Sequence, residues 1–217
     1  MGAITRSVAN NITTGGVILP NGINDASVAS ITALAQVSAG DGITLISSQT
    51  ASSSASLSFT TGIDSTYRTY LFKWINCHPA TIRDEFQFNM STDGGSNYNV
   101  TKTTTFFRTY HGEDGVSATL AYHTPSDLAQ STGYQRIMAG MGNGADESGS
   151  GTLTLFNPSS TTYVKHFIAN VNFYTYADYT LETFIGGYGN TTSAVNAIRF
   201  QFASGNFDGT IYLYGIK

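Results

Sequence analysis

Short runs of alternating apolar and polar residues, separated by glycine, serine and asparagine turns, occupy most of the chain after residue 43. Side chains along a strand alternate between two faces, so this pattern is typical of strands with one buried and one exposed face. The runs expected as strands are residues 43–46, 55–60, 70–75, 85–90, 98–110, 120–123, 152–156, 163–174, 181–185, 197–203 and 210–214. A two-sheet jelly roll needs about eight to ten strands. The sequence therefore predicts an all-β, jelly-roll-like β-sandwich.

Aromatic residues repeat along one face of several expected strands. In residues 70–75 both faces are largely apolar, which indicates a central strand. The aromatic core is predicted to contain Phe59, Phe72, Trp74, Phe86, Phe88, Phe167, Phe200 and Phe202. Full burial stabilises a folded chain by about 1.5 to 3 kcal/mol for each such side chain, so this set is sufficient to hold a domain together.

Three segments between the expected strands are predicted to be irregular. The serine-rich residues 52–56 indicate a flexible connection. Residues 93–96 have the sequence Asp-Gly-Gly-Ser, which predicts a tight turn where the chain reverses. A long stretch from residue 124 to Gly151 ends in closely spaced glycines and is expected to form a loop.

Residues 1–45 differ from the rest because they contain no Phe, Tyr or Trp. We expect an extended N-terminal attachment arm over residues 1–45, followed by a β-sandwich domain over residues 46–217. Within the arm, Asn24 and Asp25 could cap one short helix that stops near Gly40, or the arm could have no helix. Its aliphatic side chains are expected to dock onto a neighbouring subunit or another partner protein: Val17, Ile18, Leu19, Val28, Ile31 and Leu34.

The 217 residues are enough for one substantial hydrophobic core, and only 11% of them are charged. Such a surface carries little charge repulsion, which suits a protein that packs against copies of itself. The net charge of −4 with ten Lys and Arg argues against nucleic acid as a partner. No secretion signal and no run of eighteen apolar residues is evident, so we expect a chain made in a cytoplasm and not inserted into a membrane.

No reactive motif stands out in the sequence. The four histidines, at positions 78, 111, 123 and 166, lack zinc-site spacing and paired cysteines, although a site built from distant segments stays open. Cys77 is the single cysteine and is expected to pack as an apolar residue that does not meet His78. The acidic pairs at 84–85, 113–114 and 146–147 are interpreted as solvated loop charge. We therefore expect no enzyme, no metal and no cofactor.

One aromatic cluster, Phe173-Tyr-Thr-Tyr-Ala-Asp-Tyr179, suggests a possible binding role. Tyr174, Tyr176 and Tyr179 present flat amphipathic rings that could contact a receptor or a host surface glycan. Alternatively, they complete the core or a subunit interface, and the sequence favours that interpretation.

Four stretches resemble structural proteins of tailed-bacteriophage virions, particularly those of aquatic phages: Leu45-Ile-Ser-Ser-Gln-Thr-Ala-Ser-Ser-Ser-Ala-Ser-Leu-Ser-Phe59, Ser91-Thr-Asp-Gly-Gly-Ser-Asn-Tyr98, Gly151-Thr-Leu-Thr-Leu-Phe-Asn-Pro158 and Ser204-Gly-Asn-Phe-Asp-Gly-Thr-Ile-Tyr-Leu-Tyr-Gly-Ile216. The resemblance implies a non-enzymatic, oligomeric and often trimeric module on the virion surface, acting as a tail fibre, a spike or a capsid decoration protein. A carbohydrate-binding module and a polysaccharide hydrolase are the alternatives.

Overall fold

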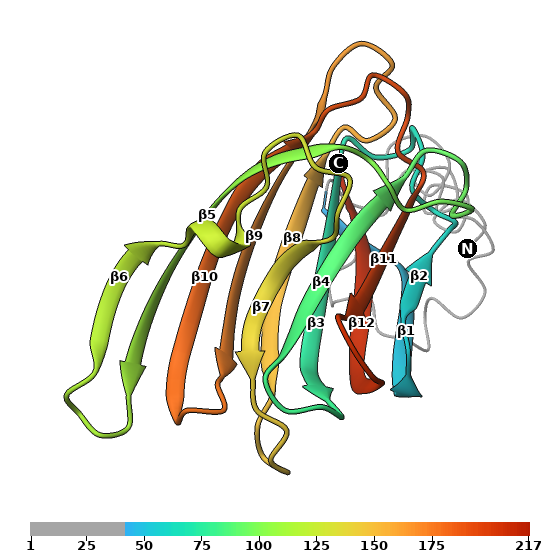
Figure 1. Ribbon diagram of the computed structural model, residues 1–217. Coiled ribbons are helices and arrows are strands. Elements are labelled where there is room, and N and C mark those ends of the chain that lie inside the picture. The colour runs from blue at the N-terminus through green and yellow to red at the C-terminus, as the bar shows by residue number, and fades with distance from the viewer. Residues whose placement is uncertain (1–41) are drawn as a thin grey trace, which may run out of the picture. The chain divides into compact units, whose positions relative to one another are not determined.

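The computed structural model describes residues 42–217, which form two antiparallel sheets packed as a sandwich (Figure 1). The larger sheet has eight strands in the order β1-β12-β3-β8-β9-β10-β5-β6, and the smaller has four in the order β2-β11-β4-β7. The elements are β1 (Ile43–Ser54), β2 (Leu57–Phe59), β3 (Thr69–Pro79), β4 (Asp84–Ser91), β5 (Lys102–Gly112), β6 (Ala118–Tyr122), the short 3₁₀ helix η1 (Thr124–Ser126), β7 (Gln135–Met141), β8 (Gly149–Phe156), β9 (Lys165–Tyr174), β10 (Tyr179–Gly189), β11 (Ala197–Phe202) and β12 (Phe207–Ile216).

Eight of the strands have the order of a jelly roll. Strands β1-β12-β3-β8 form one layer and β2-β11-β4-β7 the other, and the chain changes layer at each step except from β4 to β7. The predicted jelly-roll-like β-sandwich is confirmed. The remaining strands, β5, β6, β9 and β10, extend the larger sheet past the smaller one (Figure 1). We call these four strands the wing.

The predicted aromatic core is confirmed, because all eight of its members are buried between the two sheets. Phe200 on β11 lies at its centre. Its ring centroid is 5.3 Å from that of Phe72 on β3 and 5.9 Å from that of Phe86, with which it stacks. The rings of Phe59, Trp74 and Phe88 also contact Phe200. Alternation along each strand places these rings inward and explains why the sequence pattern identified them.

Strand β1 is longer than predicted. It pairs with β12 along its whole length, with two register shifts, and includes residues 52–54 of the serine-rich run. The predicted flexible connection is therefore wrong for those three residues. Ser54 pairs with Phe207 on β12, and the N–H of Ser53 donates to the Asp208 carboxylate in the intervening register shift, so these small polar residues stay in the sheet. The strand begins at Ile43, so residues 43–45 of the expected arm lie in the first strand.

Strand β7 was not predicted, because it lies inside the expected loop. Its apolar residues do not alternate, since Ile137 and Met138 are adjacent, and two register shifts interrupt its pairing with β4. Gly140 near its end has a φ of +80°, which further breaks the alternation. A strand that buries Gln135 and contains such irregularities has no clear period of two in its sequence.

The turn at residues 93–96 is confirmed, with Gly94 and Gly95 in the left-handed region. It does not join a hairpin, because β4 pairs with β11 and β7 while the chain crosses to β5 in the other sheet. Strand β3 is central, as predicted, since it lies between β12 and β8. Only one of its faces is covered, however: Trp74 is fully buried, whereas Ile75 on the opposite face is 37% exposed.

The short helix considered near Asn24 lies outside the described residues. So do the six aliphatic side chains expected to dock: Val17, Ile18, Leu19, Val28, Ile31 and Leu34. Within residues 42–217, no helix has the length and apolar character needed to cross a membrane.

Candidate functional site

The outer face of the wing brings together side chains from four strands. Backbone pairing places Glu182 on β10 opposite Asn172 on β9 and opposite Thr109 on β5. Thr109 in turn lies opposite Leu120 on β6. Since the neighbouring residues Phe173, Leu181 and Thr183 are buried, alternation directs this row outward. We call the three polar residues, Asn172, Glu182 and Thr109, the polar row.

Two hairpin turns hold the wing in register. Between β5 and β6, the carboxylate of Asp114 accepts hydrogen bonds from the backbone N–H of Val116 and of Ser117, each at 2.9 Å. These bonds, that of Ser117 first, lower the pKa of Asp114. Between β9 and β10, the N–H of Asp178 donates to the carbonyl of Thr175, and Asp178 has a φ of +61°, which Asp tolerates better than most residues.

A hollow of about 490 Å³ lies over the polar row, and we call it the outer hollow. Its lining also contains His111 and Thr180, which lie opposite each other on β5 and β10. Asn172 Nδ2 donates to Thr180 Oγ1 at 3.0 Å, and this bond leaves the Asn172 side-chain oxygen free to accept. The volume is within the range of about 300–1,000 Å³ found for small-molecule sites.

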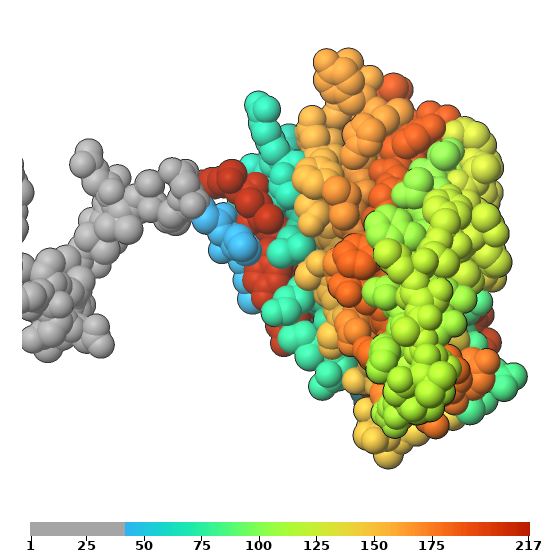
Figure 2. All heavy atoms as spheres, turned by 90° about the vertical axis from the view of Figure 1, so that its left-hand side faces the viewer, coloured from blue at the N-terminus to red at the C-terminus, as the bar shows by residue number. Residues whose placement is uncertain are grey.

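Aromatic side chains flank the outer hollow along the strands. On one side, Phe107 and Phe184 face each other across β5 and β10, with ring centroids 5.1 Å apart and an interplanar angle of 13°. Tyr122 on β6 lies opposite Phe107 and is about half exposed. On the other side, Tyr174 lies opposite Thr180. The polar row therefore has aromatic side chains on both of its sides along the strands. Figure 2 shows the β6 edge of the wing nearest the viewer.

A second, smaller hollow of about 190 Å³ lies on the inner side of the wing, and we call it the inner hollow. Tyr179 stacks on Tyr110 there, with centroids 5.1 Å apart and an interplanar angle of 7°. Tyr176 also lines it, and the Arg83 guanidinium lies 4.1 Å from the centre of the Tyr176 ring. This contact is a cation–π interaction at the surface.

The three tyrosines singled out from the sequence therefore do not form one surface. Tyr176 and Tyr179 line the inner hollow, whereas Tyr174 borders the outer one. Hydrogen bonds and burial raise the pKa of Tyr174 to about 12, with burial as the largest cause, so its phenol stays protonated at neutral pH. Sequence reasoning missed Asn172, Glu182 and Thr109 as partners, because each lies on a different strand and no local motif connects them.

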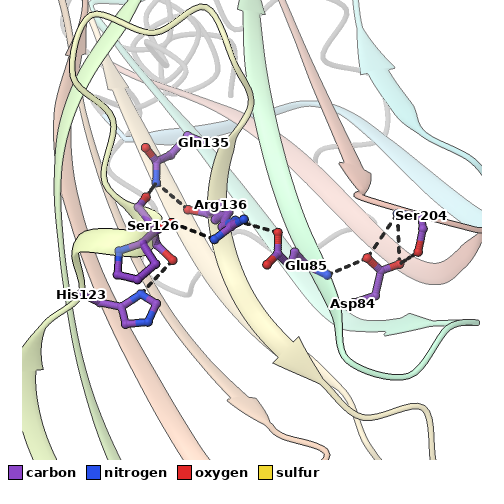
Figure 3. Close-up of polar contacts among 8 residues, drawn as sticks. Asp84, Glu85, His123, Ser126, Gln135, Arg136 and Ser204 are labelled. Atoms are coloured by element: carbon purple, nitrogen blue, oxygen red, sulfur yellow. Dashed lines mark hydrogen bonds and ion pairs between the residues drawn. The ribbon is translucent and has the colours of Figure 1, made fainter.

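Polar contacts join the smaller sheet to the segment that follows β6, and we call them the seam (Figure 3). The Arg136 guanidinium on β7 forms an ion pair with Glu85 on β4 at 2.6 Å and donates to the carbonyl of Pro125 at 2.8 Å. Next to it, Asp84 is buried and accepts hydrogen bonds from Ser204 N and Oγ. The interpretation of residue 84 as solvated loop charge is wrong, because strand pairing encloses its carboxylate.

A serine and a histidine also meet at the seam. His123 Nδ1 lies 2.9 Å from Ser126 Oγ (Figure 3), and burial is the main cause that lowers the pKa of His123. Ser126 is only 2% exposed, and its N–H donates to the carbonyl of His123. This pair is therefore a contact within the 3₁₀ turn, and the hydroxyl is not open to a substrate.

Cys77 and His78, which are neighbours in the sequence, both occupy structural positions. Cys77 is fully buried, and burial raises the pKa of its thiol well above the usual range. His78 Nδ1 lies 2.6 Å from the carbonyl oxygen of Glu147, so the cysteine and the histidine do not form a pair. Among residues 42–217, no group of three or more His, Cys, Asp or Glu side chains is arranged to hold a metal ion.

Two buried lysines lie where the wing meets the core. Lys102 on β5 and Lys165 on β9 both pair with Gly189 on β10. Lys102 Nζ donates to Asn89 Oδ1 at 2.5 Å and to the carbonyl of Val100 at 2.7 Å. Burial lowers the pKa of Lys102 to about 7 and also lowers that of Lys165. Lys102 Nζ donates to amide oxygens and not to a carboxylate. Lys102 therefore holds neighbouring segments together through hydrogen bonds and not through an ion pair.

Comparison of the chain with models of protein families, with curated proteins and with solved structures finds no match.

Proposed function

We propose that this chain is a non-enzymatic structural protein of a phage particle, a homo-oligomeric jelly-roll subunit on the virion surface that attaches through residues 1–45. The observation that carries the proposal is the outer face of the eight-stranded sheet, which no other element within residues 42–217 covers. Ile43, Leu45 and Ile168 are each more than half exposed on that face. Ile75 and Phe156 are partly exposed on it as well.

Such a face suits contact with other subunits. Apolar side chains spread over one sheet gain free energy when a partner removes them from water, at roughly 25 cal/mol for each Å² buried. The low charge of the chain leaves little repulsion to oppose the approach of a second copy. The resemblance to virion proteins supports the same assignment. In a particle, the chain would be either a tail fibre or spike, or a capsid decoration protein. We propose a trimer as the assembly.

Two measurements test this proposal. Light scattering of the purified chain at micromolar concentration is expected to give the mass of an oligomer, and a monomer mass would contradict it. Counting copies in purified particles separates the two forms, because hundreds of copies indicate decoration and a few dozen indicate a tail appendage. Absence of the chain from the particles would remove the virion assignment altogether.

A second candidate function is contact with a receptor or a glycan on the host surface. The observation that favours it is the position of the wing, which lies outside the eight strands that complete the jelly roll. Both hollows are lined largely by wing residues. Binding residues are often carried by segments added to a rigid scaffold. Glycan-array binding by the purified chain tests this function, and an array without any signal would contradict it.

A further inference from the structure

We propose that the outer hollow binds a neutral saccharide, with Glu182, Asn172 and His111 hydrogen-bonding its hydroxyl groups and the flanking aromatic rings packing against its ring faces. This inference rests on the second candidate function and specifies its site and ligand. It does not depend on the position of the chain in a particle.

The first argument is the number of polar groups that the fold leaves without a protein partner. The one ion pair within residues 42–217 is that of Arg136 and Glu85, so the Glu182 carboxylate has no cationic partner there. In the same part of the chain, neither Glu182 nor His111 makes a side-chain hydrogen bond. Together with the Asn172 oxygen, they offer acceptors and donors at neighbouring positions. Hydroxyl groups of a sugar both donate and accept, and they match such a set.

The second argument is the spacing of the polar row. Adjacent strands lie about 4.8 Å apart, so the polar row across β9, β10 and β5 spans about 10 Å. This length suits a short oligosaccharide lying across the strands. Thr109 Oγ1 donates to the carbonyl of Thr119 at 2.9 Å and can still accept a bond from a ligand. The saccharide would therefore meet a polar group on three successive strands.

The third argument is the position of the aromatic residues. Phe107 and Phe184 stack on each other at one border of the polar row, and Tyr174 lies at the other. Sugar rings carry C–H groups on their faces and hydroxyls at their edges, so apolar ring surface beside hydrogen-bonding groups is complementary to them. Aromatic rings lose little conformational freedom when they make such contacts.

Charge argues against anionic ligands, and hydrogen bonding argues against purely apolar ones. The lining of the outer hollow contains one carboxylate, Glu182, and no lysine or arginine. A phosphate or an acidic sugar would bring a second negative charge next to it, with no lysine or arginine in the lining to offset the repulsion. A purely apolar ligand would cover the polar row and leave its groups without hydrogen bonds, which costs free energy. A neutral saccharide avoids both penalties.

The test uses the full chain on an array of neutral and acidic oligosaccharides, followed by calorimetric titration with the best neutral binder. Glu182→Ala and Asn172→Ala are expected to weaken binding by about tenfold or more, because each removes a group that hydrogen-bonds the ligand. The matched control is Thr154→Ala, which lies on the same face on β8, outside the hollow. It is expected to bind like the unmodified chain. Circular dichroism checks that all variants keep their strands.

Each other outcome overturns the inference in a recognisable way. Binding only to acidic oligosaccharides, or equal affinity in the two variants and the control, rejects the neutral-saccharide site. Loss of binding in Tyr176→Ala alone would assign the ligand to the inner hollow, and glycan recognition would then stand while this site fails. An array without signal rejects both the site and the second candidate function, whereas incorporation of the chain into particles is measured separately.

Discussion

The jelly-roll core and the wing share one sheet but are stabilised in different ways. In the core, two sheets enclose aromatic rings, and Phe200 contacts five of them. The inner face of the wing is instead closed partly by polar contacts. Thr183 Oγ1 donates to the carbonyl of Ile137 at 2.8 Å, and Thr104 Oγ1 donates to Gln135 Oε1 at 2.7 Å. The outer face of the wing has no cover within residues 42–217. The difference indicates that the core provides the stability of the fold, whereas the wing exposes side chains that can bind a ligand.

The largest expected effect is in the core. Phe200→Ala is expected to lower the free energy of unfolding by about 3–5 kcal/mol, because it leaves a cavity among aromatic rings that cannot collapse fully. Urea unfolding followed by tryptophan fluorescence measures it, since Trp74 lies against Phe200. The control is Phe107→Ala in the wing, where the ring is 40% exposed and less area is lost. Equal losses in the two variants would contradict the proposed division between core and wing.

The next effect concerns Lys102 at the junction of the two regions. In the folded chain the pKa of Lys102 is about 7, below its ordinary value of 10.5. Between these two pH values the unfolded chain binds a proton that the folded chain does not. Stability is therefore expected to rise with pH across this window, by at most about 1.4 kcal/mol per pH unit from this group. Below pH 7 the cost of burying the charge is fully present.

Lys102→Met is the variant that isolates this contribution. Urea unfolding at pH 7, 8 and 9 is expected to show a smaller rise of stability with pH in the variant than in the unmodified chain. Part of the rise remains, because the pKa of Lys165 is also lowered by burial. An identical pH dependence in both chains would show that Lys102 keeps its ordinary pKa and is not enclosed at the junction.

A smaller effect is expected at the contact between the wing and β7. Thr183→Val keeps the shape of the side chain but removes the hydroxyl, so the buried carbonyl of Ile137 loses its donor. The expected cost is about 1–3 kcal/mol. Amide hydrogen exchange should accelerate in β5 and β10 more than in β11 if the wing opens separately. The control Thr180→Val changes an exposed threonine on the outer face of the same strand, and uniform acceleration in all strands would argue against separate opening.

The smallest effect is expected at the edge of the wing. Leu120→Ser changes a side chain that is 72% exposed on β6, so the free energy of unfolding should stay within about 0.5 kcal/mol of the unmodified value. Thermal unfolding with the same buffer measures it. Leu120 also lines the outer hollow. The variant therefore tests whether binding to the hollow can change while the free energy of unfolding stays the same. A loss above about 2 kcal/mol would mean that β6 supports the fold.

The sequence by itself determined the class of fold and the interior of the molecule. Alternation in residues 85–90 marked Phe86 and Phe88 as buried, and the structure has both rings in the core. This worked because a strand with one covered face requires a period of two in its own sequence, so the information is local. Where that period is missing, as in β7 with its register shifts, the sequence predicted a loop.

Only the tertiary structure decided which distant side chains meet. Asp84 appeared to be solvated, yet Ser204, far along the chain, covers its carboxylate. Asn172, Glu182 and Thr109 belong to three strands, and they form one row only because of the pairing register of β9, β10 and β5. A slip of one residue would turn one of these side chains to the opposite face. Register depends on contacts summed over whole strands, and for that reason no local pattern in the sequence specifies this site.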